Sequence, residues 1–229
     1  MAAHGKNYRD VADTIEAGNA LDPKSAVEKV KEMAFAKFDE TVDVAIRLGV
    51  DPRHADQIVR GTVQLPAGTG RNVRVLAIVQ GDRVSEAEAA GADYVGTEYI
   101  AKIEGGWLDF DVAVVTPDLM KDVAKLGRVL GPRGLMPTPK AGTVTTDIGR
   151  VVGEAKAGRI EYRVDKFGIV HAPIGKVSFE AGALLDNLTA LMDSIVRNRP
   201  SATKGSYVGS VTISSTMGPG VSIDPNLYK

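Results

Sequence analysis

The sequence predicts a mixed α/β and α+β protein in which one domain is inserted into another. Strand candidates near both ends of the chain alternate polar and apolar residues, which is typical of an antiparallel sheet with one open face. Strand candidates between them are almost continuously apolar and are separated by helices, which is typical of a parallel sheet covered on both faces. The 229 residues suffice for two domains of about 100–150 residues. We therefore expect a discontinuous domain of residues 1–66 plus 159–229 and an inserted domain of residues 67–158.

The N-terminal segment contains one helix and two strands by pattern. Ser25 and Glu28 have the spacing of a capping box, which predicts a helix over residues 25–36. Residues 41–48 alternate between polar and apolar side chains, and so do residues 58–65. Because only a polar loop separates these two strands, we expect them to pair with each other in antiparallel fashion.

The central segment alternates strands with helices, which is typical of an open α/β unit. The expected elements are, in order, a buried strand at 73–79, a helix begun by Ser85 and Glu88 and ended by Gly91, a short strand at Tyr94 and Val95, a helix at 97–105, a buried strand at 110–115, a helix from Thr116 to Leu130, and a helix from Asp147 to Ala157.

The C-terminal segment returns to the alternating pattern. Residues 159–165 and 169–177 are expected to form a hairpin around a turn at 165–168, and residues 206–215 the last strand. Between them, residues 182–198 predict a long amphipathic helix. Its expected inward side chains are Leu184, Leu185, Leu188, Leu191, Met192, Ile195 and Val196.

Composition excludes several classes of protein. The chain has 28 Lys and Arg against 29 Asp and Glu, so it does not resemble a general polyanion binder, and any nucleic-acid site must be a local face. The absence of Cys excludes disulfides and thiolate chemistry, and it is typical of proteins of the reducing cytoplasm. No secretory leader pattern begins the chain, and no apolar run approaches the roughly 18 residues of a membrane span.

A nucleotide-using enzyme is the main alternative that we considered. The two glycines of residues 68–73 precede the first buried strand, whereas a dinucleotide fingerprint follows it. The sequence has no phosphate-binding P-loop, nucleophile elbow or zinc-protease motif, and its three histidines form no metal-ligand pattern. A paired-carboxylate site at Asp109 and Asp111 is less favoured than two solvated side chains. We expect no catalysis, no cofactor and no metal.

Residues 125–144 form the most unusual stretch. They combine four glycines and three prolines with Lys125, Arg128, Arg133 and Lys140. A long, stiff, basic loop in a compact domain is typical of phosphate contact. A structural crossover loop with solvated charges explains the composition equally well.

Segments of the discontinuous domain supply a second candidate surface. Cations, one aromatic residue and hydroxyl groups stand at the ends of several expected elements, and structured RNA is recognised by such groups if they converge. Core packing of Phe38 and Met217 and a simple turn at 216–219 are the alternative explanations.

Several segments together resemble one family, the bacterial form of ribosomal protein L-one of the large subunit. The matching stretches are KFDETV (37–42), LGVDPR (48–53), RGTVQLPAGTG (60–70), AGADYVG (90–96), LGRVLGPRGLMPTPKAGTV (126–144), AGRIEYRVDKFGIVHAPIGKVSF (157–179) and TMGP (216–219). The resemblance covers essentially the whole chain in order. It implies a discontinuous two-layer α+β domain with an inserted three-layer, Rossmann-like α/β domain.

The resemblance also implies function. Family members bind large-subunit ribosomal RNA (rRNA) at the mobile stalk, assist movement and release of the exit-site tRNA, and repress their own operon by binding its mRNA. We therefore expect a cytoplasmic, ribosome-bound protein that is monomeric when off the ribosome. By motif match, the RNA-binding residues are Lys37, Phe38, Thr41, Arg163, Asp165, Lys166, Gly168, His171, Lys176, Thr216, Met217 and Gly218. Lys125, Arg128, Arg133 and Lys140 are expected to make secondary contacts with RNA or tRNA.

Two features depart from the family pattern. Phe167 occupies the expected hairpin turn, where a smaller or polar residue is typical, and either contacts RNA or packs. The near-zero net charge predicts a specific face with moderate salt dependence. A purely structural scaffold is a further alternative, in which Lys37, Phe38 and Met217 have no consequence for RNA binding.

Overall fold

A computed structural model describes residues 5–15, 20–203 and 205–228. The chain divides into two compact units, unit 1 (Met1–Gly70 with Ile160–Lys229) and unit 2 (Arg71–Arg159), and each is described by itself. The boundary falls at Gly70 instead of after Pro66. The buried Asn187 explains this difference, because its Oδ1 accepts from the Ala67 N–H at 3.0 Å and its Nδ2 donates to the Gly68 carbonyl at 2.9 Å.

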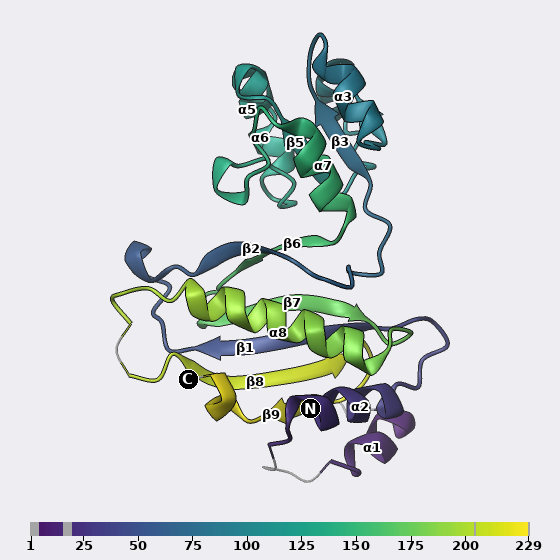
Figure 1. Ribbon diagram of the computed structural model, residues 1–229, viewed down its shortest axis with the longest axis vertical. Coiled ribbons are helices and arrows are strands. Elements are labelled where there is room, and N and C mark those ends of the chain that lie inside the picture. Colours follow the sequence, from purple (N-terminus) through teal and green to yellow (C-terminus); the bar gives the residue numbers. More distant parts are fainter. Residues whose placement is uncertain (1–4, 16–19, 204, 229) are drawn as a thin grey trace. The chain divides into compact units, whose positions relative to one another are not determined.

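Unit 1 is built on a four-stranded antiparallel sheet. Its order is β7 (Ile169–Lys176), β1 (Thr41–Leu48), β8 (Val208–Ser215) and β9 (Val221–Ile223), as Figure 1 shows. The expected pairing of β1 with the strand that follows it is wrong. That strand, β2 (Arg60–Gln64), pairs instead with β6 (Arg159–Arg163) in a separate two-stranded sheet. Alternation predicts strands, but it does not select their partners.

Two helices cover one face of this sheet and complete the two layers. Helix α2 (Pro23–Met33) and helix α8 (Ala181–Arg197) join the inward residues of β1, β7 and β8 in a single apolar core. Ser25 does not cap α2. The Asp22 carboxylate accepts from the Ser25 N–H at 3.1 Å, with Pro23 in the first turn.

Helix α8 presents a narrower apolar face than expected. Leu184, Leu188, Leu191, Met192 and Ile195 are fully buried, but Leu185 is only half-buried and Val196 is exposed. The buried Asn187 lies on the inner face in their place, where it holds residues 67 and 68.

The expected hairpin of residues 159–177 is reduced to its turn. Strand β6 pairs with β2 and strand β7 with β1, and only an isolated antiparallel bridge, Val164 to Val170, joins the two arms. The turn itself forms at the predicted residues, with the Asp165 N–H donating to the Ile169 carbonyl at 2.8 Å.

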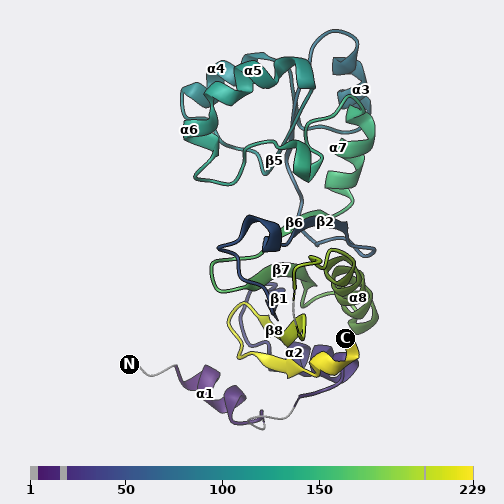
Figure 2. The same cartoon turned by 90° about the vertical axis from the view of Figure 1, so that its left-hand side faces the viewer.

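Unit 2 has three layers. Strands β4 (Tyr94–Val95), β3 (Val75–Ile78) and β5 (Val112–Val115) form a parallel sheet in that order. Helices α3 (Arg83–Ala89) and α7 (Ile148–Lys156) cover one face, and α4 (Glu98–Glu104), α5 (Met120–Lys125) and α6 (Gly127–Leu130) the other (Figure 2). This confirms the predicted three-layer α/β class.

Two helices of unit 2 differ from the sequence prediction. Helix α3 begins at Arg83, so Ser85 lies inside it and caps nothing. The helix expected from Thr116 to Leu130 is a 3-10 turn at Pro117–Leu119 followed by α5 and α6, which are interrupted at Leu126. By contrast, Asp147 begins α7 as predicted, accepting from the Arg150 N–H at 3.4 Å.

The remaining elements were not predicted. They are helix α1 (Lys6–Ala12), strand β9, and 3-10 helices at Ala55–Gln57, Pro139–Ala141 and Pro225–Tyr228. All are short, so hydrophobic periodicity carries little signal for them.

Candidate nucleic-acid interface

The loop after β8 is joined to the start of β1. The Thr216 hydroxyl accepts from the Thr41 N–H at 3.0 Å and donates to the Thr41 carbonyl at 3.2 Å. The register continues this junction, since Val42 is opposite Ser215 on one side and Thr41 is opposite Lys176 on the other. Strand pairing and the Thr216 bonds thus bring together Thr41, Lys176 and Thr216. With their neighbours in sequence, these residues form a group that we name the Met217 end: Lys37, Phe38, Thr41, Lys176, Thr216, Met217 and Gly218.

A buried carboxylate, Glu40, fastens this junction and was missed in the sequence. One Glu40 oxygen accepts from the Met217 N–H and the other from the Ala36 N–H, both at 2.9 Å. Burial acts to raise the pKa of Glu40, but these hydrogen bonds and one from Ser215 outweigh it and lower the pKa. The sequence gives no signal of this role, because one of the two groups that Glu40 binds, the Met217 N–H, lies 177 residues away in the chain.

Lys176 is held by the protein at the Met217 end. Its ammonium donates to the Thr41 hydroxyl at 2.9 Å and to the Asp39 carbonyl at 3.2 Å. The neighbouring Asp39 carboxylate accepts from the Ser178 N–H and hydroxyl, at 3.1 and 2.8 Å. Lys176 therefore braces the loop before β1, whereas Lys37 is exposed on that loop.

Two large apolar side chains project from the Met217 end. Phe38 is 56% exposed and Met217 is 50% exposed, although the neighbouring strands β1 and β8 contribute to the core of unit 1. The alternative that these residues pack in the core is therefore wrong. The Glu40 carboxylate fixes the backbone of Met217 and that of Ala36, two residues before Phe38, so both apolar side chains extend from anchored loops.

The remaining candidates form a second group, the hairpin end: Arg163, Asp165, Lys166, Gly168 and His171. Asp165 organises it by accepting from the Phe167 and Ile169 N–H groups, both at 2.8 Å, and lying 3.7 Å from His171 Nε2. These partners lower the pKa of Asp165, the Ile169 N–H most strongly. Gly168 has a φ of +79°, and the carbonyls of Leu48 and Val50 leave little room for a side chain.

The structure does not bring the two groups to one point. Lys176 ends β7 and the hairpin turn precedes Ile169 at its start, so seven residue-to-residue steps of about 3.3 Å, roughly 23 Å in all, separate the two ends. The open face of the sheet lies between them. Asp43, Arg47 and His171 alternate with buried neighbours there and are exposed. A ligand must follow the sheet to contact both groups.

Phe167 does not pack against the protein. It is 81% exposed at the tip of the turn, next to the exposed Lys166. This exposure contradicts the packing role for Phe167, and its contact with RNA stays a prediction.

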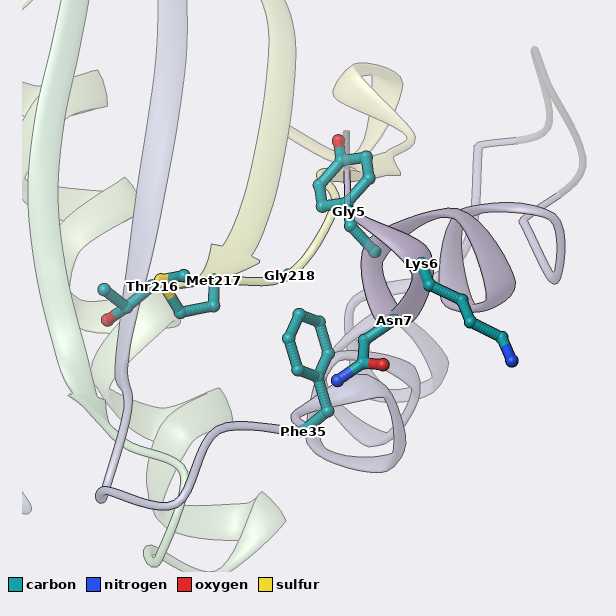
Figure 3. A pocket seen from close by; sticks show the side chains of 8 residues that line it. Gly5, Lys6, Asn7, Phe35, Thr216, Met217 and Gly218 are labelled. Carbon is teal, nitrogen blue, oxygen red and sulfur yellow. The ribbon is translucent and has the colours of Figure 1, made fainter. Parts of the chain in front are cut away.

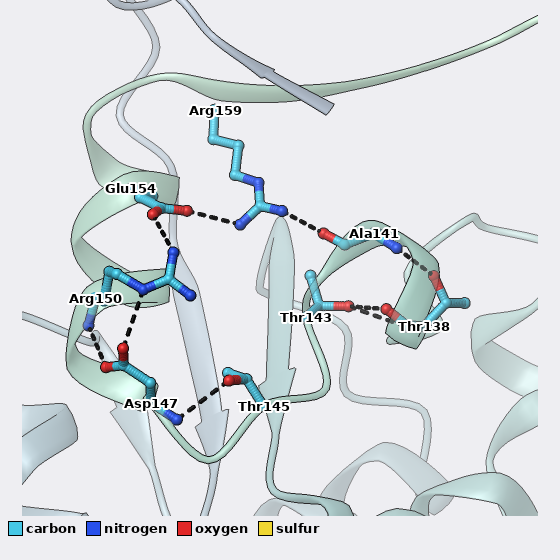
Figure 4. Close-up of polar contacts among 8 residues, drawn as sticks. All are labelled: Thr138, Ala141, Thr143, Thr145, Asp147, Arg150, Glu154 and Arg159. Carbon is cyan, nitrogen blue, oxygen red and sulfur yellow. Dashed lines mark hydrogen bonds and ion pairs between the residues drawn. The ribbon is translucent and has the colours of Figure 1, made fainter. Parts of the chain in front are cut away.

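The basic loop of unit 2 is held in place by side-chain bonds (Figure 4). Arg159 donates to the Ala141 carbonyl at 2.6 Å and to Glu154 at 2.8 Å, and Glu154 also accepts from Arg150. Thr138 and Thr143 bond across the same turn, with the Thr138 N–H to Thr143 Oγ1 distance 2.9 Å. These bonds fix residues 138–143 at the end of the basic stretch, whereas Lys125 and Arg128 lie on α5 and α6 and not in a loop.

The four secondary candidates differ in availability. Lys125 is paired with Asp122 at 2.8 Å, and this partner raises its pKa. Arg128 and Arg133 are exposed. The side chain of Lys140 lies outside the described part of the chain.

Other chemistries find little support in unit 1 or unit 2. Among residues 5–15, 20–203 and 205–228, no three His, Asp or Glu side chains gather as metal ligands would. Within the same ranges, no helix has the length and apolar composition needed to cross a bilayer.

Two comparisons with known proteins indicate the same family. Residues 30–219 match the model of the "Ribosomal protein L1p/L10e family". The chain is also 60% identical, over the full length of both proteins, to "Large ribosomal subunit protein uL1" of Gemmatimonas aurantiaca. The chain therefore belongs to the L1p/L10e family of ribosomal proteins, whose members are non-enzymatic components of the ribosome.

Proposed function

We propose that the chain, as an L1-family protein of the large ribosomal subunit, contacts rRNA primarily through the Met217 end of unit 1. The observation that carries the proposal is the pair of exposed apolar residues, Phe38 and Met217, on two loops that the Glu40 carboxylate joins through the Ala36 and Met217 N–H groups. Solvent-exposed apolar side chains on a rigid junction favour a partner surface over a role in folding.

The chemistry of this end suits structured RNA. A-form helices and loops are recognised by shape, 2′-hydroxyl contacts, phosphates and stacking. Phe38 and Met217 offer flat or deformable apolar surface, Gly218 allows close backbone approach, and Lys37 offers a cation for a phosphate. We place the hairpin end second, as a contact reached by RNA that continues along the open sheet face.

The remaining expectations belong to the same proposal. The rRNA site is the mobile stalk, and the protein works there in the cytoplasm. The exposed Arg128 on α6 and the exposed Arg133 just after it support a contact with exit-site tRNA that assists its movement and release. The free protein, a monomer, represses its own operon by binding an mRNA site with the shape of the rRNA site.

An affinity titration tests the rRNA proposal. The purified chain is titrated with a stalk fragment of large-subunit rRNA and with a scrambled RNA of equal length, each at several salt concentrations. We expect a strong preference for the stalk that persists at high salt, because shape contacts are less screened than phosphate contacts. Equal, weak and salt-sensitive binding of both RNAs would overturn it.

Two further arms test the finer claims. The mRNA leader of the operon should compete with the stalk fragment for the same site, and adding the protein should lower translation of a reporter carrying that leader. Arg133→Ala should slow tRNA release from ribosomes while leaving stalk affinity unchanged. A negative result in the first experiment excludes repression of the operon, and one in the second excludes the role in tRNA release. Neither result affects the proposed rRNA site.

A further inference from the structure

A groove of about 580 Å³ opens directly beside Met217, on the side away from the sheet. Figure 3 shows its walls. Thr216, Met217 and Gly218 form one wall, the first residues of helix α1 form the other, and the Phe35 ring stands between them. The groove lies within the size range of small-molecule pockets, about 300–1,000 Å³.

Helix α1 is anchored as a wall of this groove. Val11 and Ile15, at and beyond its C-terminal end, pack against the core of unit 1. The Thr14 hydroxyl contacts Met33 Sδ at 3.8 Å, which ties the same segment to α2. The N-terminal end of α1, with Lys6 and Asn7, is exposed at the lip.

The lining combines the apolar side chains of Phe35 and Met217 with polar residues, which are Lys6, Asn7, Tyr8 and Thr216. Phe35 is only half-buried and Met217 is half-exposed, so both offer apolar faces to the groove. The Asn7 amide points toward the Phe35 ring, whereas the Lys6 side chain points away from the groove (Figure 3). An amide carries both donors and an acceptor, as the edge of a nucleobase does.

We propose that this groove takes one unpaired nucleobase of the bound RNA, with the base stacked against Phe35 and Met217 and its edge bonded to Asn7. The inference rests on the proposed function, because the wall formed by Thr216, Met217 and Gly218 belongs to the Met217 end. RNA sequence is read chiefly at unpaired bases that stack on aromatic side chains. The groove thus adds base selection to a surface that otherwise recognises shape.

The test uses the stalk rRNA fragment with a single abasic nucleotide placed in turn at each unpaired position. Each RNA is titrated with the unaltered chain, with Phe35→Leu and with Asn7→Ala. Phe35→Leu keeps apolar volume but removes the aromatic face. Asn7→Ala alters an exposed side chain of a peripheral helix, so it remains informative if Phe35→Leu impairs folding. Leu227→Ala is the control, since it removes exposed apolar surface beyond β9, which runs away from residues 216–218.

We expect one abasic position to lower the affinity of the unaltered chain about tenfold, within the range for a stacked base. Removing the base at the same position should lower the affinity of Phe35→Leu by less than about twofold, because the base and the ring act through one contact. Asn7→Ala should lose part of the preference for the natural base there, and Leu227→Ala should behave like the unaltered chain.

Equal losses in all proteins at every abasic position would overturn the inference. So would tighter RNA binding by Asn7→Ala, which would indicate that α1 covers the surface instead of lining a base site. The two proposals fail separately. If the intact fragment is preferred over scrambled RNA but no position couples to Phe35, only the groove is excluded, and if no preference exists, the proposed function falls first.

Discussion

Thr41 and Thr216 lie 175 residues apart in the chain and share two hydrogen bonds through one hydroxyl. Thr216 Oγ1 accepts from the Thr41 N–H at 3.0 Å and donates to the Thr41 carbonyl at 3.2 Å. These bonds join the first residue of β1 to the first residue after β8 in one rigid corner, and Met217 follows immediately. Met217 is therefore anchored next to this corner, with about half of its side chain exposed.

Replacing this hydroxyl tests whether the corner matters for RNA. Thr216→Val keeps the shape and removes both bonds, so the free energy of unfolding should fall by about 1–2 kcal/mol. Affinity for the stalk fragment should fall about tenfold, on the order of 1.4 kcal/mol, because residues 217 and 218 lose their position. Thr216→Ser keeps the hydroxyl and should restore both quantities. Equal RNA affinity for the Val and Ser variants would exclude a role of the corner.

A negative charge at residue 217 should be severely disruptive for binding. Met217→Asp places a carboxylate against RNA phosphates and removes apolar contact, so the affinity should fall by about a hundredfold or more, roughly 3 kcal/mol. The side chain is half-exposed, so the melting temperature should change little. Met217→Leu is the matched control and should bind nearly as the unaltered chain does. Near-unaltered affinity of the Asp variant would sink the site assignment.

The two lysines of the Met217 end should differ in their effects. Lys37→Ala should lower the slope of log affinity against log salt by roughly 0.7–0.9, the value for one lost phosphate contact. Lys176 instead donates to Thr41 and Asp39, so Lys176→Ala should chiefly lower the melting temperature. Titrations at four salt concentrations with parallel thermal melts separate the cases. An unchanged slope for Lys37→Ala would remove it from the contacts.

Glu40 should make stability depend on acid. Its pKa is lowered in the folded state, so its stabilisation is present above the ordinary carboxyl pKa of 4.5 and is lost as the pH falls through the lower folded value. Glu40→Gln should therefore be less stable than the unaltered chain at pH 7, and the difference should shrink below pH 4.5. Thermal melts from pH 3 to pH 7 measure it, and a difference independent of pH would contradict the account.

Arg159 should control the order of the unit 2 loop. Arg159→Lys keeps the charge but cannot bond the Ala141 carbonyl and Glu154 in the same fork, so the loop should open more easily. Amide hydrogen exchange at Thr143 should speed up by about tenfold, on the order of 1.4 kcal/mol of local stability. Stalk affinity should not change. Unaltered exchange in the Lys variant would show that the threonine bonds alone hold the loop.

The sequence predicts the elements of this fold better than their partners. The alternation in Thr41–Leu48 and the apolar run in Val75–Ile78 are local properties, and both strands are confirmed. That β1 pairs with β7 and β8 depends on contacts across more than 120 residues, which no local pattern encodes. The change of strand pattern along the chain predicted the inserted topology, and the family resemblance implied the same arrangement.

In the candidate site, too, local features were predictable from the sequence and features that depend on distant segments were not. The exposure of Phe38 and Met217 follows from where their loops lie after folding, so composition alone favoured burial. Glu40 and Asn7 gave no sequence signal. Glu40 binds the backbone of a distant segment, and Asn7 lines a groove that distant segments form together. Asp147 was predictable because a helix cap is a local arrangement.

Amide hydrogen exchange of the chain with and without the stalk fragment tests the central claim most directly. The account predicts slowed exchange in residues 37–41 and 216–218, with a smaller effect at 163–171 and little change in unit 2. Slowed exchange confined to residues 71–159, with the Met217 end unaffected, would contradict it.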